Sequence, residues 1–192
     1  MQPTARAALL IAFLGISAAC SDSTGTEVPI ILLTDTVEVA APLPQNAGLP
    51  TAIDITPSAS GGVIGGRYPE RSRDALQWDL TLRVRNGELV LVPARAVGIP
   101  NTRAAITQAL QGETFEGLRE APGQSAFSPD SSVVLRTGNV YAVRSRPAAC
   151  NAGAGEFYGK IEPLDVDVAN GRLRFRIVTN LQCEDPRLVV DQ

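Results

Sequence analysis

The clearest pattern in the chain is a regular alternation of apolar and polar residues over 78–85. A period of two is typical of a strand that buries one of its faces. Asn86-Gly87 follows, which is the strongest short signal for a two-residue hairpin turn, and residues 88–92 form a second apolar run. The predicted register sets Arg85 opposite Glu88 and apolar residues opposite one another, so both faces of the hairpin are consistent.

A second hairpin is predicted over residues 164–177, again around Asn-Gly, at positions 170 and 171. A two-residue loop sets Asp167 opposite Arg174 and Asp165 opposite Arg176. Apolar residues then meet on the other face, so one face is core and the other is a solvated row of charges.

The remaining patterns indicate short strands over 131–146, 157–161 and 188–190, and one short helix near 102–111. We therefore predict a mainly β fold over residues 75–192, a compact antiparallel sandwich or barrel-like domain built of hairpins. Residues 28–74 are rich in proline and glycine and are expected to form a linker. The linker includes possible first strands, because the start of this segment is too apolar to remain in water.

The first twenty residues have the pattern of an export signal. Arg6 precedes an apolar stretch over residues 7–16, and Ser17-Ala18-Ala19-Cys20 follows. A permanent membrane helix needs about 20 apolar residues. This shorter stretch suits a signal peptide, residues 1–19, that is removed by cleavage.

Residues 1–22 resemble the type II signal peptide of bacterial lipoproteins. The resemblance implies that Cys20 becomes the first residue of the mature protein and carries acyl chains, with residues 20–27 as a tether. It implies a membrane-anchored protein of the cell envelope, at the outer membrane and facing the periplasm or the surface. Ordinary signal peptidase would also accept Ser17 and Ala19, and would leave Cys20 as a free thiol. The strand patterns after residue 138 are faintly similar to those of uncharacterised bacterial lipoproteins, which implies no activity.

The chain has three cysteines, and an odd number in an exported protein needs an explanation. Acylation of Cys20 leaves Cys150 and Cys183 as a pair in an oxidising compartment, where a disulfide is expected. The alternative is two buried free thiols.

Composition excludes several kinds of chemistry. The chain has no histidine, which removes histidine-based triads and histidine-ligated metals, and no cofactor or metal site is predicted. Asp165 and Asp167 form a pair of carboxylates, but each is expected to face an arginine. The net charge of −3 argues against nucleic acid as a partner.

One possible binding surface is a row of strand-borne arginines that would suit an anionic glycan: Arg144, Arg146, Arg172, Arg174 and Arg176. The alternative is a solvated face that acidic residues neutralise, and the loops at 148–155 around Cys150 are a second possible binding surface.

The sequence favours a non-catalytic binding or structural module that is anchored to a membrane by lipid and binds an envelope protein or glycan. The rival functions are a carboxylate-dependent envelope hydrolase and an assembly subunit of an outer-membrane complex. A hydrolase predicts a pocket with at least two unpaired acids, a binding module predicts acids paired with arginine, and an assembly subunit predicts an exposed apolar patch.

Overall fold

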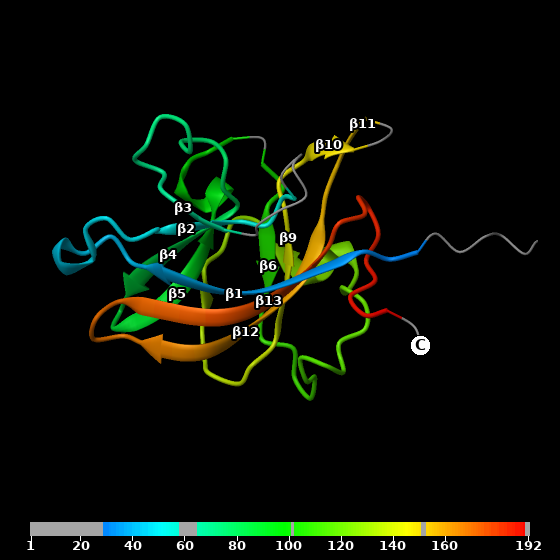
Figure 1. The fold of residues 1–192 in the computed structure, drawn as a ribbon. Coiled ribbons are helices and arrows are strands. Elements are labelled where there is room, and N and C mark those ends of the chain that lie inside the picture. Colours follow the sequence, from blue (N-terminus) through cyan, green and yellow to red (C-terminus); the bar gives the residue numbers. More distant parts are fainter. Residues whose placement is uncertain (1–28, 58–64, 101, 151–152, 191–192) are drawn as a thin grey trace, which may run out of the picture.

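A computed structural model of the chain describes residues 29–57, 65–100, 102–150 and 153–190. The export signal, Cys20 and the tether predicted after it lie outside these residues. The described chain is mainly β and antiparallel, as predicted, with two larger sheets and one separate two-stranded hairpin (Figure 1). The start of the first strand and the C-terminal segment lie at the same end of the molecule (Figure 1).

The two larger sheets pack their apolar faces on one another. In spatial order, the six-stranded sheet consists of β1 (Leu32–Ala40), β13 (Arg172–Asn180), β12 (Tyr158–Asp167), β9 (Tyr141–Arg144), β6 (Ala105–Thr107) and β7 (Phe127–Ser128). The five-stranded sheet consists of β3 (Gly65–Arg67), β2 (Ala52–Asp54), β4 (Leu80–Arg85), β5 (Glu88–Pro93) and β8 (Val133–Val134). The small hairpin consists of β10 (Ala148–Cys150) and β11 (Gly153–Gly155).

The main core lies between the larger sheets, where residues such as Leu82, Leu91 and Phe175 are fully buried. A second apolar cluster covers part of the outer face of the six-stranded sheet, with Phe115 and Leu188 packed near Tyr158. The middle of that sheet is therefore covered on both sides, and β1 and β2 bring residues that precede position 75 into the two sheets.

The helix predicted near 102–111 is wrong, because the structure has β6 there and, among the described residues, only three short 3-10 turns: Pro44–Asn46, Ala94–Val97 and Gln124–Ala126. The reason lies in the neighbours Ala105 and Ile106, which are both buried but in different clusters. Ile106 belongs to the main core and Ala105 to the outer cluster. Consecutive residues point to opposite faces in a strand, which a one-sided helix does not allow.

The predicted register of the first hairpin is confirmed, since Arg85 pairs with Glu88 and Leu82 with Leu91. Its turn residues both have positive φ, 52° at Asn86 and 75° at Gly87, as the favoured two-residue turn requires.

The predicted register of the second hairpin is wrong by two residues next to the turn, and by three beyond the irregularity at Pro163, where Ile177 pairs with Ile161. Asp167 pairs with Arg172 and Asp165 with Arg174, and the register shifts between Pro163 and Asp165. The carboxylate of Asp167 accepts hydrogen bonds from the backbone N and side-chain Nδ2 of Asn170, at 3.0 and 2.6 Å, which favours a wider turn. Because the shift next to the turn is an even number of residues, these aspartates and arginines keep the faces that the sequence predicts.

The strand predicted over 188–190 is also wrong. The structure has an isolated bridge between Arg187 and Glu120 at this point, and Leu188 packs into the outer cluster.

Candidate functional site

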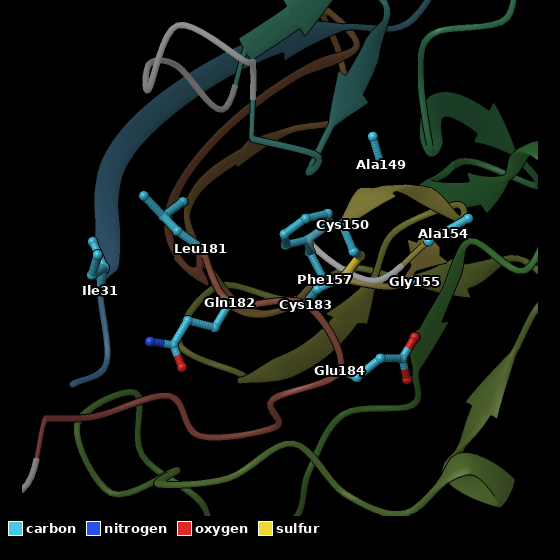
Figure 2. A pocket seen from close by; sticks show the side chains of 11 residues that line it. Ile31, Ala149, Cys150, Ala154, Gly155, Phe157, Leu181, Gln182, Cys183 and Glu184 are labelled. Atoms are coloured by element: carbon cyan, nitrogen blue, oxygen red, sulfur yellow. A yellow bond between two sulfur atoms is a disulfide. The ribbon is translucent and has the colours of Figure 1, made fainter. Parts of the chain in front are cut away.

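One pocket, here called the disulfide pocket, lies where the small hairpin meets the segment after β13 (Figure 2). Its cavity volume is about 820 Å³. The lining residues come from three places that are distant in sequence: Ile31, the small hairpin with Phe157 (residues 149–150, 153–155 and 157), and residues 181–184.

The disulfide between Cys150 and Cys183 forms part of the pocket wall, and the Cα atoms of the two cysteines are 6.0 Å apart. β10 and β11 form a sheet by themselves, so this covalent bond ties the hairpin to the segment after β13. The pairing uses two of the three cysteines of the chain.

Gly155 allows the chain to pass very close to this disulfide. A Cβ atom at Gly155 would lie 2.7 Å from Cys183 Sγ and 2.8 Å from Cys150 Sγ. It would also lie 2.8 Å from the Oε1 atom of Glu184. These distances are too short for any side chain, so a glycine is needed where the hairpin, the disulfide and Glu184 meet.

Glu184 is the one charged residue among those that line the pocket. Its backbone has a φ of 61°, which is uncommon for a residue other than glycine. Two hydrogen bonds hold it in place: Glu184 N donates to Glu156 O at 2.8 Å, and Glu184 Oε1 accepts from Glu156 N at 2.7 Å.

The rest of the lining is mostly apolar. Phe157 is buried, whereas 57% of Ile31 is exposed at the pocket margin. Leu181 lies between them in Figure 2. Gln182 donates a side-chain hydrogen bond to Pro29 O, so the pocket lies beside the first described residues of the chain.

Behind the pocket, the buried side chain of Glu156 forms ion pairs with Arg103 and with Arg144, its Oε2 atom lying 3.6 Å from Arg144 Nε. Burial and the nearby carboxylates of Glu156 and Glu184 raise the pKa of Tyr158, because each disfavours a phenolate. Arg103 and Arg144 are thus both engaged with Glu156.

A second polar group, here called the acid–arginine cluster, consists of Asp54, Asp79, Arg67 and Arg146. Arg146 Nη1 lies 2.8 Å from Asp54 Oδ1 and 3.2 Å from Asp79 Oδ1, and Arg67 Nη2 lies 2.8 Å from Asp54 Oδ2. Asp79 also accepts hydrogen bonds from the backbone N atoms of Ile55 and Arg146, both at 2.7 Å. The cluster joins β2 and the segment before β4 to the segment after β9.

The pKa values of the two acids of this cluster shift in opposite directions, although burial acts to raise both. Desolvation raises the pKa of Asp79 to about 6, against the attraction of Arg146. Burial also acts to raise the pKa of Asp54, but hydrogen bonds and charge from Arg146 and Arg67 outweigh it, so the pKa lies below its usual value. Both acids are paired with arginine.

The five arginines of the predicted binding face do not form one open surface. Arg144 and Arg146 are engaged in the ion pairs described above. Arg172 pairs across the hairpin with Asp167, and Arg174 lies between Glu38 of β1 and Asp165 of β12. Arg176 donates to Glu162 Oε2 at 2.5 Å and to Glu116 Oε1 at 2.7 Å. Acidic neighbours therefore surround the arginines of β13.

Sequence reasoning identified the loops around Cys150 but missed Glu184 and the acid–arginine cluster. Glu184 precedes Asp185-Pro186, which is an ordinary turn pattern. Asp79 and Arg146 are 67 positions apart in the sequence, so no local spacing connects them.

Within the described ranges, no three side chains from cysteine, aspartate or glutamate gather as metal ligands would. The same residues contain no helix long and apolar enough to cross a membrane. Comparison with known proteins found no matching family model, no matching curated sequence and no matching solved structure.

Proposed function

We propose that the protein is a lipid-anchored, non-catalytic module of the bacterial cell envelope, which binds another envelope component through the disulfide pocket. The observation that carries this proposal is the distribution of acids. The pocket has Glu184 as its one acidic lining residue, while the buried carboxylates of Asp54, Asp79 and Glu156 are each paired with arginine.

A carboxylate-dependent hydrolase would need a different arrangement. Two acids would have to face one cavity, one to donate a proton and one to accept a proton or attack the substrate. The buried acids Asp54, Asp79 and Glu156 are instead paired with arginine within the protein. A pocket whose side chains are mostly apolar, with a few polar groups, is typical of a binding site.

The cysteine pairing supports the lipid anchor. Because Cys150 pairs with Cys183, Cys20 is left as the single cysteine available for acylation. The nine residues from Cys20 to Pro29 span at most about 30 Å when extended. An acylated Cys20 would therefore hold the end of the domain that carries the pocket close to the membrane surface.

The intact mass of the protein purified from bacterial membranes, with and without reductant, tests the anchor. We expect the mass of residues 20–192 with three acyl chains, increased by two hydrogen atoms on reduction. A Cys20→Ala variant of the full chain is the matched control, and we expect it to lack the acyl chains. An unacylated or uncleaved wild-type mass would refute the proposed anchor.

A further inference from the structure

The charge of the disulfide pocket restricts the ligands that it can hold. Glu184 is negative, and no described lining residue is positive. Arg103 and Arg144 form ion pairs with Glu156, which lies between the lining residues Gly155 and Phe157 in the sequence. An anionic ligand would therefore face a carboxylate without a compensating charge, whereas a cationic ligand would be complementary.

The carboxylate of Glu184 is held in a fixed position. Its Oε1 atom accepts the hydrogen bond from Glu156 N, and its backbone N donates to Glu156 O. Among the described residues, Oε2 has no hydrogen-bond partner. A fixed carboxylate with one available oxygen is a preorganised acceptor for an ammonium group, because little side-chain freedom remains to be lost on binding.

The other lining residues suit the apolar part of a small molecule. Phe157, Leu181 and the disulfide form the interior of the wall, and Ile31 and Ala149 stand at its margins in Figure 2. The cavity volume of about 820 Å³ lies within the range of about 300–1,000 Å³ that is usual for small-molecule sites.

We propose that the disulfide pocket binds a ligand with an apolar body and a positively charged amine. The ammonium group lies against Glu184 Oε2, and the apolar body packs on the disulfide, which comes close to the Glu184 carboxylate at Gly155. This inference rests on the proposed binding role of the pocket. It does not depend on acylation of Cys20, so a failed binding experiment and a failed mass measurement lead to different conclusions.

Three probes of nearly equal size test the ligand class: 2-phenylethylamine, 2-phenylethanol and 3-phenylpropanoate, which differ in the charge of the head group. Each is titrated into the full mature protein in one neutral detergent and followed by ligand-observed NMR. We expect the amine to bind with a millimolar Kd and about tenfold more tightly than the alcohol, as one charge-assisted hydrogen bond would allow. The carboxylate is expected to bind most weakly.

Variants locate the binding. Glu184→Gln removes the negative charge but keeps an oxygen that accepts from Glu156 N. We expect the affinity for the amine to fall to that for the alcohol, and the affinity for the alcohol to stay unchanged. Ala149→Trp fills the pocket, and we expect it to abolish binding of both probes. Ile31→Trp, at an exposed position, is a second blocking variant. Glu38→Gln, on the outer face of β1, is the control and should change neither affinity.

Equal affinities for the three probes would overturn the proposal. Amine binding that survives unchanged in Glu184→Gln, or in a folded blocking variant, would also overturn it. Circular dichroism and the urea midpoint verify that each variant is folded.

Discussion

The acid–arginine cluster and the disulfide pocket both contain carboxylates that hydrogen bonds hold in place. The two regions differ in whether a carboxylate oxygen is left without a hydrogen-bond partner. In the cluster, Asp79 is fully buried and both of its oxygens accept hydrogen bonds. In the pocket, Glu184 is held through one oxygen and the wall extends out to the exposed Ile31. The comparison separates polar groups that join the two sheets from a polar group that is available to a ligand.

The largest expected effect is in the acid–arginine cluster. Arg146→Met removes a guanidinium that contacts Asp54 and Asp79. Two carboxylates are then left buried with too little compensation, and we expect a loss of about 3–5 kcal/mol in the free energy of unfolding. Urea unfolding at pH 7 measures it. The matched control is Arg174→Met on the outer face of β13, which should change stability by less than about 0.5 kcal/mol; equal losses would contradict the structural role of the cluster.

The next effect concerns the covalent bond of the pocket. Replacing both Cys150 and Cys183 by serine opens a link across 33 positions of sequence, and we expect a loss of about 3–4 kcal/mol on the chain-entropy model. The wild-type protein, unfolded in urea with and without reductant, should show a similar difference. A stability that is unchanged in both measurements would mean that the hairpin is held without the disulfide.

A smaller expected effect is the pH dependence of the contribution that Asp79 makes to stability. Because the pKa of Asp79 is raised to about 6, the native state binds its proton more tightly than the unfolded state. The contribution of Asp79 to stability is therefore fully present at low pH and is lost as the pH rises through about 6. The destabilisation by Asp79→Asn should be about 2 kcal/mol smaller at pH 7 than at pH 4. A cost that grows with pH would show that Arg146 lowers this pKa instead.

The smallest expected effect sharpens the contrast between the two regions. Glu184→Gln should change the free energy of unfolding by less than about 0.5 kcal/mol, because its amide oxygen still accepts from Glu156 N and no arginine loses a partner. Urea unfolding beside Asp79→Asn measures the difference. A loss as large as that of Asp79→Asn would place Glu184 among the groups that hold the fold together.

The sequence predicts the β elements best where the determinants are local. The first hairpin follows from alternation and from Asn86-Gly87, whose positive φ values fit one turn type. The second hairpin carries the same Asn-Gly pair, but a carboxylate of Asp167 that bonds to Asn170 widens the turn. Alternation alone does not reveal that competition, because a two-residue shift next to the turn keeps the charged residues on the same face. Nor does it reveal the irregularity at Pro163 and Asp165, which leaves Leu164 exposed.

The site is harder to predict because its parts are distant in sequence. The cysteine count and the export-like first residues indicate that Cys150 and Cys183 pair, and so identify one part of the pocket. Glu184 enters it through a positive φ and a bond to Glu156, neither of which has a sequence signal. The alternation predicts that Asp79 faces water, whereas its burial depends on Arg146 from the distant segment after β9.

Hydrogen exchange measured by mass spectrometry tests most directly the claim that the pocket binds and the acid–arginine cluster does not. The full mature protein is compared with and without 2-phenylethylamine. We expect slower exchange in the peptides that carry Cys150, Phe157 and Cys183, and no change in those that carry Asp54 and Asp79. Protection at Asp54 and Asp79, or none at the two cysteines, would contradict this account.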